Sequence, residues 1–268
     1  MITIDYLITT FNKTNEELIE IINRSNVFGH ILVGNQGMKE DSIKHVEFDG
    51  KVITIFNQKS VGVSKNRNFL LKKAESEYVT FLDDDMYYAD NVQNEIEEIL
   101  PKYRLNCVRF NVLSDNNSRP IKQLKKCGFV GFRKLSSFGA WGCFFRREFL
   151  LENKIFYNES IGPGTEINHG EDGVFLKTFL LYSKIFFIPK VSFHVSQKES
   201  TWHNENRDLK TELFSHGFNY YLLYGKKAKL MAVLFLISHM HCYPPKTKFK
   251  TLKSFMIAGI NNAKEQVQ

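Results

Sequence analysis

One short stretch, an apolar run followed by three consecutive aspartates, constrains this sequence more than any other feature. Residues 78–82 read Tyr-Val-Thr-Phe-Leu, a run of β-branched and aromatic residues typical of a buried strand. Asp83, Asp84 and Asp85 follow at once. Because open α/β sheets bind ligands at the carboxyl ends of their strands, we expect these carboxylates at a ligand site.

Two interpretations of the three aspartates are open at this point. Adjacent carboxylates repel one another unless a cation lies among them, and oxygen ligands suit Mg²⁺ or Mn²⁺, which usually keep waters and share phosphate oxygens. The alternative is an acidic turn that caps the next helix, since aspartate favours turns and N-caps. The residues alone favour neither interpretation.

The elements predicted over the first hundred residues favour an α/β fold. The strands are predicted at residues 1–8, 31–33, 51–56 and 78–82, with helices beginning after Thr14 and near Val63. Strands and helices that alternate at this spacing are typical of βαβ units and a mostly parallel sheet. Neither GxxxxGK[ST] nor GxGxxG occurs, so bound phosphates would contact a metal and side chains such as Lys65 and Arg67.

The second half predicts shorter strands and then helices. Strands are predicted at residues 107–112, 129–132 and 141–145, a helix from 170 to 182, and a hairpin-like pair at 185–188 and 191–195. From Asn206 onward only helices are predicted, broken by Gly225 and by Pro244-Pro245. With 268 residues, 43% of them hydrophobic, the chain can form one large domain with a helical appendage.

Composition restricts the compartment and the partners. The four cysteines are far apart, which argues against a zinc site and a disulfide framework and fits a reducing compartment. We expect no signal peptide, and no apolar run approaches the roughly 18–20 residues of a membrane-spanning helix. Residues 205–268 carry +6 of the net charge of +7, which indicates a solvated helical surface or an anionic neighbour such as a membrane.

Five short motifs follow one another along residues 1–200. They are Thr10-Phe11-Asn12, Gly62-Val63-Ser64-Lys65-Asn66-Arg67-Asn68, Phe81-Leu82-Asp83-Asp84-Asp85, Phe144-Phe145-Arg146-Arg147-Glu148 and Gly170-Glu171-Asp172. In this order they resemble the motifs of the inverting glycosyltransferases of family 2. The resemblance implies the GT-A fold, a mostly parallel central sheet flanked by helices, with a C-terminal helical extension. It implies a catalytic domain at residues 1–204, with a nucleotide-sugar-binding half (1–105) and an acceptor-binding half (106–204), and the basic extension at 205–268.

The resemblance also implies roles around the donor. Asp83 would lie near the ribose, Asp85 would bind a Mn²⁺ or Mg²⁺ ion that bridges the diphosphate, and Asp84 would be its neighbour. His194 matches a position where some members have a metal ligand; the alternative is a buried histidine with its hydrogen bonds satisfied. The other residues expected to contact the nucleotide-sugar are Thr9, Thr10, Phe11, Asn12, Asn35, Gln36, Lys65 and Arg67.

On the acceptor side the resemblance implies that Asp172 is the catalytic base and that Glu171 orients the acceptor. A general base takes the proton of the attacking hydroxyl and contributes on the order of 10²–10⁴-fold, and a divalent cation neutralises the leaving diphosphate. The alternative is that both acids complement a helix dipole. Trp141, beside Gly142, would stack on the acceptor sugar or belong to the core.

One departure concerns the nucleobase. The family usually has an Asp-Asp-Gly-Ser type turn after the second strand, whereas this chain has Gly34-Asn35-Gln36-Gly37. Asn and Gln each carry a donor and an acceptor, so either can pair with uracil, thymine or guanine. UDP-sugars are the family default, with dTDP- and GDP-sugars open.

These inferences predict an inverting hexosyl- or N-acetylhexosaminyltransferase of surface polysaccharide synthesis. The acceptor would be a glycan or lipid-linked glycan, in the cytoplasm or at the inner face of the cell membrane. We expect a peripheral contact of the basic C-terminal helices with anionic lipid, and no nucleic acid partner. The alternatives are a nucleotidyltransferase with a similar sheet and a non-catalytic glycan- or nucleotide-binding module.

Overall fold

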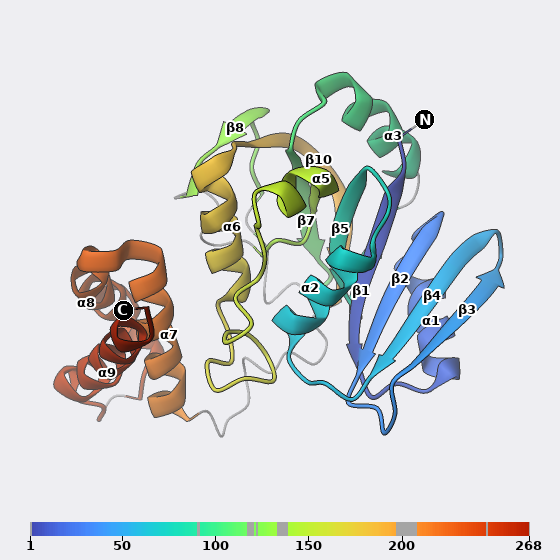
Figure 1. The fold of residues 1–268 in the computed structure, drawn as a ribbon. Helices are drawn as coiled ribbons and strands as arrows, with labels where there is room; N and C mark the ends of the chain where they lie inside the picture. The colour runs from blue at the N-terminus through green and yellow to red at the C-terminus, as the bar shows by residue number, and fades with distance from the viewer. Residues whose placement is uncertain are drawn as a thin grey trace.

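A computed structural model of the protein contains a mixed sheet whose strands come from most of the chain (Figure 1). The first strand, β1 (Ile4–Phe11), lies in the interior of this sheet. The structure describes residues 2–89, 92–116, 121, 123–132, 139–196, 208–244 and 246–267. Within these residues the strand order is β3-β4-β2-β1-β5-β9-β7-β10-β6, with β8 paired to β10. The strands are β2 (His30–Gln36), β3 (Ser42–Phe48), β4 (Lys51–Gln58), β5 (Tyr78–Asp83), β6 (Met86–Tyr88), β7 (Cys107–Ser114), β8 (Gly128–Val130), β9 (Cys143–Arg146) and β10 (Ile185–Val195).

Strands β4, β2, β1 and β5 are parallel to one another, as the sequence predicts for the first half. Their register sets Thr9 of β1 opposite Gly34 of β2 and opposite Asp83 of β5. The carboxyl ends of the central strands therefore meet at one edge, and the three aspartates lie there. Beyond β5 the sheet is mixed, because β9 is antiparallel to both β5 and β7 while β10 is parallel to β7.

Two sequence predictions about strands are wrong. Residues 185–195 form one long strand and not a hairpin-like pair, because β7 pairs with this segment along most of its length while β8 and β6 pair with its other side. Pro189 lies where the β7–β10 register shifts, and such an irregularity tolerates the missing proline N–H. Trp141 precedes β9, which begins only at Cys143. Edge strand β3 was not predicted; it is mostly exposed.

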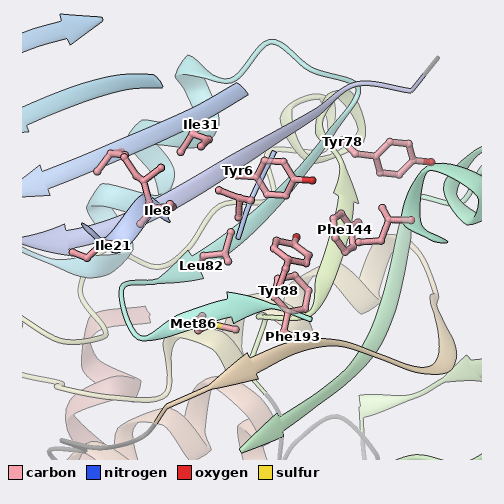
Figure 2. Packing of buried hydrophobic residues seen from close by; sticks show 14 of the residues in the cluster. Tyr6, Ile8, Ile21, Ile31, Tyr78, Leu82, Met86, Tyr88, Phe144 and Phe193 are labelled. Carbon is pink, nitrogen blue, oxygen red and sulfur yellow. The ribbon is translucent and has the colours of Figure 1, made fainter. Parts of the chain in front are cut away.

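Hydrophobic side chains form a core on each face of the sheet, since successive residues of a strand point to opposite faces. In β1, Tyr6 and Ile8 belong to one core and Leu7 to the other. The first core, in Figure 2, includes Tyr88 and Phe193, whose ring centroids lie 4.2 Å apart, and it is covered by α1 (Asn15–Ser25) and α3 (Val92–Tyr103). The second core lies under α2 (Val63–Lys73), α5 (Arg147–Glu152) and α6 (Glu171–Tyr182).

The last three helices, α7 (Leu209–Tyr224), α8 (Ala228–His239) and α9 (Phe249–Val267), pack beside α6 and have a core of their own (Figure 1). Short 3₁₀ turns at 225–227 and 240–242 flank α8. Helices α7 and α9 approach closely at Gly217 and Gly259: a Cβ at Gly217 would lie 1.9 Å from the carbonyl oxygen of Met256. No helix in the described part of the chain is both long and apolar enough to cross a membrane.

We expect Gly217→Ala to destabilise the protein. The added methyl group has to push α9 away from α7, and overpacking of this kind typically costs about 1–3 kcal/mol. Gly173→Ala is the matched control, because Gly173 is also helical but its added Cβ meets nothing within 4 Å. The control should be neutral or stabilising by up to about 1 kcal/mol. Urea unfolding followed by circular dichroism measures both, and equal effects would contradict the close approach.

Candidate functional site

A buried arginine, Arg67, joins the two acidic motifs of the sequence. Its side chain is 4% exposed. One guanidinium nitrogen, Nη2, lies 2.7 Å from Asp83 Oδ1, and the other, Nη1, lies 2.9 Å from Asp172 Oδ1 and 3.5 Å from Glu171 Oε1. The aspartate that ends β5 and the acids that begin α6 thus meet on the two sides of one guanidinium group.

Helix α2 holds Arg67 in place through its neighbours in the helix. The Asn66 carboxamide donates to the carbonyl of Gly34 in β2 (2.7 Å), and a Cβ at Gly34 would overlap that carboxamide. The Asn68 carboxamide donates to the carbonyl of Tyr157 (2.9 Å). At the start of α2, Ser64 Oγ donates to the carbonyl of Ile161 (2.6 Å), which ties the loop before α6 to this helix.

Tyr157 completes the surroundings of Asp172. Its hydroxyl donates to Asp172 Oδ1 at 3.1 Å, and Arg67 lies over its ring at 5.1 Å from the centroid. The ring stacks on Phe175 of α6 at 4.2 Å. Burial, reinforced by the charge of Asp172, raises the pKa of Tyr157 well above its usual value, so the hydroxyl stays a donor. The sequence prediction missed Tyr157, which lies outside every recognisable motif.

Burial and neighbouring charges shift the pKa values of Arg67 and Glu171 in this cluster. Burial alone would lower the pKa of Arg67, but the charges of Asp83 and Asp172 raise it, and the guanidinium stays charged. Burial and the adjacent charge of Asp172 raise the pKa of Glu171 to about 7, with Arg67 opposing the shift. Glu171 therefore titrates near neutral pH, a property that an acid on a solvated helix terminus would not have.

A pocket of about 430 Å³ opens beside the cluster, at the carboxyl ends of β1, β2 and β5. Its lining includes predicted donor residues, namely Thr9, Thr10, Phe11, Gln36, Asp83 and Asp84. The Thr9 hydroxyl donates to Asp83 Oδ1 (3.3 Å) and the Thr10 hydroxyl to Asp84 Oδ2 (3.1 Å), which orients both carboxylates. Gly62, Pro163 and Gly164 form the opposite wall. A second pocket, of about 470 Å³ between β3, β4 and α2, contains none of the predicted site residues.

Four residues predicted to contact the donor lie outside this pocket lining: Arg67, described above, and Asn12, Asn35 and Lys65. Asn35 is fully buried, and its carboxamide bonds to the main chain of Lys13 and to Asn57, so it fixes the turn. A contact between Asn35 and the nucleobase stays a prediction. Asn12 is exposed and has a left-handed backbone conformation, and its N–H donates to the carbonyl of Gln36. Lys65 is exposed on α2.

Asp85 and His194, the predicted metal ligands, lie on neighbouring segments because β6 pairs with β10. His194 pairs with Tyr87, and the Ser196 N–H donates to the carbonyl of Asp85 (3.0 Å). Asp85 itself lies in the turn before β6, next to the end of β10. His194 Nδ1 lies 3.1 Å from Asp115 Oδ1, a contact that the sequence did not indicate.

Among the described residues no cluster of three or more His, Cys, Asp or Glu side chains forms a metal cage. The donor set nevertheless fits a magnesium-like ion, which is usually held by one or two carboxylates together with substrate phosphates and waters. Asp85 would supply the carboxylate and His194 a nitrogen. The chemistry such a cation supplies is neutralisation of charge on a leaving diphosphate.

Trp141 and Gly142, the predicted acceptor residues, lie in the loop before β9. Arg109, a fully buried residue of β7, donates to the carbonyls of Gly139 (2.7 Å) and Trp141 (3.2 Å), and its guanidinium lies 5.5 Å from the indole centroid. Trp141 also packs on the core, so it is half buried and not a free surface ring. Gly142 has a φ of +77°, which favours glycine, and a Cβ there would meet Val112 at 2.8 Å.

The C-terminal helices brace the start of α6. Asn219 of α7 is buried, and its carboxamide donates to the carbonyl of His169 (2.6 Å), the residue before Gly170. Gly170 has a φ of +98°, and a Cβ there would overlap the carboxamide of Asn219. The position of Glu171 and Asp172 therefore depends on α7, a link that no sequence pattern indicated.

We expect Arg67→Met to destabilise the protein strongly, because it leaves three carboxylates close together without a cation. Removing one partner of a buried ion pair costs about 3–5 kcal/mol. Arg67→Lys should recover only part of the loss, since one ammonium group cannot contact both sides of the cluster. Arg146→Met is the control: Arg146 pairs with Glu148 at the surface, an interaction worth at most about 1 kcal/mol. Similar unfolding free energies for Arg67→Met and the control would contradict the bridging role.

The raised pKa of Glu171 predicts a pH dependence of stability. Between pH 4.5 and about 7 the unfolded chain releases the Glu171 proton before the folded chain does, so this group lowers stability as pH rises through that window, by up to about 3 kcal/mol. Glu171→Gln removes this contribution. Urea unfolding measures the unfolding free energy of the variant and of wild type at pH 5 and at pH 8. The variant should be more stable relative to wild type at pH 8 than at pH 5. The same difference in unfolding free energy at both pH values would contradict the raised pKa.

Comparisons with known proteins agree with this geometry. The sequence model described as "Glycosyl transferase family 2" matches residues 8–157. No curated protein sequence matches this chain. The chain is similar in structure to TarS residues 1–349 from S. aureus in complex with UDP-GlcNAc, with a TM-score of 0.67 and 15% identity, covering 99% of this chain and 81% of that chain.

Two further solved structures are similar at lower scores. GalNAc-T7 with UDP, GalNAc and Mn²⁺ has a TM-score of 0.56 and 14% identity, covering 96% of this chain and 54% of that one. The mannosyltransferase PcManGT from Pyrobaculum calidifontis, with GDP-Man and Mn²⁺, has a TM-score of 0.52 and 12% identity, covering 99% and 88%. At these identities the likeness shows the fold. Because the family match spans more than half of the residues, this chain belongs to glycosyl transferase family 2 and has its GT-A fold.

Proposed function

We propose that this glycosyltransferase moves one sugar, with inversion, from a nucleotide-sugar to a hydroxyl group of a glycan or lipid-linked glycan. The observation that carries the proposal is the meeting of Asp83 and Asp172 on Arg67, beside the 430 Å³ pocket. An inverting transfer needs a donor site and an acceptor-side base next to each other, so that the hydroxyl can attack the anomeric carbon opposite the leaving diphosphate.

Asp172 is the proposed base. Arg67 and Tyr157 both donate to its Oδ1, and no residue in the described part of the chain donates to Oδ2. With Oδ1 held from two sides, the carboxylate has a fixed orientation and offers Oδ2 to the acceptor hydroxyl. Glu171 would bind the acceptor beside it. At neutral pH Glu171 is partly protonated, so its carboxyl group can donate as well as accept a hydrogen bond.

The donor would lie in the pocket, with its base beside Phe11 and Gln36 and its ribose beside Asp83. The Phe11 ring is 55% exposed at the pocket, and Gln36 donates to Ser60 Oγ (3.1 Å), which leaves the carboxamide oxygen as an acceptor for an imide N–H. Uracil, thymine and guanine all carry such a group. Solved neighbours hold UDP, UDP-GlcNAc or GDP-Man, and we propose a UDP-sugar first, with dTDP- and GDP-sugars next.

Asp85 and His194 are the proposed protein ligands of a Mn²⁺ or Mg²⁺ ion at the diphosphate, with Asp84 as a neighbour. Two of the similar structures contain Mn²⁺. The resemblance of their motifs also supports nucleotide contacts for Asn12, Lys65 and Arg67. For Arg67 the contact would be indirect, through Asp83. Trp141 and Gly142 are proposed at the acceptor.

The sugar would be a hexose or an N-acetylhexosamine, and the pathway the synthesis of a surface polysaccharide at the inner face of the cell membrane. We assign the transfer itself to residues 1–204. We assign residues 205–268 to a helical extension, in which α7 braces the start of α6 through Asn219. The family and the order of the motifs support these assignments by analogy.

The test is thermal unfolding with a panel of nucleoside diphosphates and their sugars, with and without Mn²⁺. A ligand that binds only the folded state raises the unfolding midpoint. We expect the largest rise with UDP or a UDP-sugar, a dependence on Mn²⁺, and its loss in Asp85→Ala. Asp172→Asn should keep the rise while transfer to acceptor falls on the order of 10²–10⁴-fold.

Three outcomes would contradict the proposal. No rise with any nucleotide would exclude the donor site. A binding module would be indicated if a nucleotide raises the unfolding midpoint, Asp172→Asn leaves that rise unchanged, and the wild-type protein transfers no sugar to any acceptor or to water. Metal-dependent release of pyrophosphate from a nucleoside triphosphate and a sugar phosphate would indicate the nucleotidyltransferase instead.

A further inference from the structure

Helix α8 carries a row of exposed apolar side chains on its outer face. Leu230, Leu234 and Ile237 are 60%, 49% and 61% exposed. They are spaced four and three residues apart, so they lie along one face of the helix over about 10 Å. We call these three residues the α8 stripe. Single exposed apolar residues are ordinary on protein surfaces, whereas an aligned row marks an interaction surface.

The inner face of α8 is also apolar. Ala228, Ala232 and Leu236 are buried in the core that α8 shares with α7 and α9. A helix that is apolar all round is normally covered on all sides. Here α8 lies at the outer edge of the molecule, away from the sheet (Figure 1), and its stripe faces outward. The covering surface must therefore come from outside the described chain.

Lysines flank the stripe at both ends of α8. Lys226 and Lys227 directly precede the helix, and Lys246 and Lys248 follow the turn after it. All four are exposed, and none forms an ion pair with another residue in the part of the chain that the structure describes. The surface around the stripe is thus positively charged and available to an anionic partner.

We infer that the α8 stripe inserts into the headgroup region of an anionic phospholipid bilayer, with the flanking lysines on the lipid phosphates. Apolar burial and attraction to anionic lipid are the two contributions that hold an interfacial helix on a membrane. A second copy of the chain would bring like charges together around the same stripe, which opposes association. A nucleic acid would leave the apolar row without a partner.

Vesicle flotation tests this surface with the full chain and no substrate. We expect binding to vesicles of phosphatidylcholine mixed with phosphatidylglycerol, and much weaker binding to phosphatidylcholine alone. The triple variant Leu230→Gln, Leu234→Gln and Ile237→Gln should lower the partition coefficient about tenfold or more. Each of Lys226→Gln and Lys227→Gln should lower it about fivefold, and high salt should reduce the remainder.

The matched controls change equally exposed residues elsewhere. Ile43→Gln with Val52→Gln removes apolar side chains that are 59% and 49% exposed at β3 and β4, and Lys39→Gln removes a lysine there. The controls should bind as wild type does. Equal binding of wild type and the triple variant, or equal binding to both vesicle types, would overturn the inference.

A concentration-dependent dimer that the triple variant abolishes, with no vesicle binding, would also overturn it and assign the stripe to a second copy. Because the vesicles contain neither nucleotide nor sugar, the result is independent of the proposed transfer reaction. Unchanged unfolding midpoints of the variants show that the helices remain folded.

Discussion

The structure of the site depends on the neutralisation of one buried cation. The Arg67 guanidinium is almost completely removed from water, which is tolerated only because carboxylates contact it on both sides. Those carboxylates are equally dependent on Arg67, since Glu171 and Asp172 are themselves largely buried, at 13% and 16% exposure. The end of β5, the middle of α2 and the start of α6 are therefore held together by a single charge balance.

The second consequence of this arrangement concerns the C-terminal helices. Asn219 holds the residue before Gly170, so α7 supports the segment that carries the proposed base. The same three-helix unit turns the outer face of α8 away from the rest of the molecule. One side of the unit thus supports the start of α6, and the other side presents an exposed apolar row with lysines beyond both ends of α8.

Much of the fold and part of the site follow from local sequence patterns. The buried strand at residues 78–82, the aspartates after it and the βαβ order of the first half all have the structure that their residues predict. The positions of Asp83 at a strand end and of Asp172 at a helix start were also predicted, because both are local features, whereas their roles came from the resemblance and stay a prediction. The hairpin-like pair at 185–195 was wrong, since only the pairing with β7 makes that segment one strand.

The sequence by itself determined most of the strands and helices and which acids lie at their ends, because periodicity and turn chemistry act over a few residues. Tertiary structure alone decided which of those groups meet. Asn35 and Gln36 are neighbours with the same chemistry, yet the register buries the first and turns the second to the pocket. Tyr157 belongs to no motif and reaches Asp172 only because the loop before α6 docks on α2. Such contacts depend on where distant segments pack, and no local pattern encodes that position.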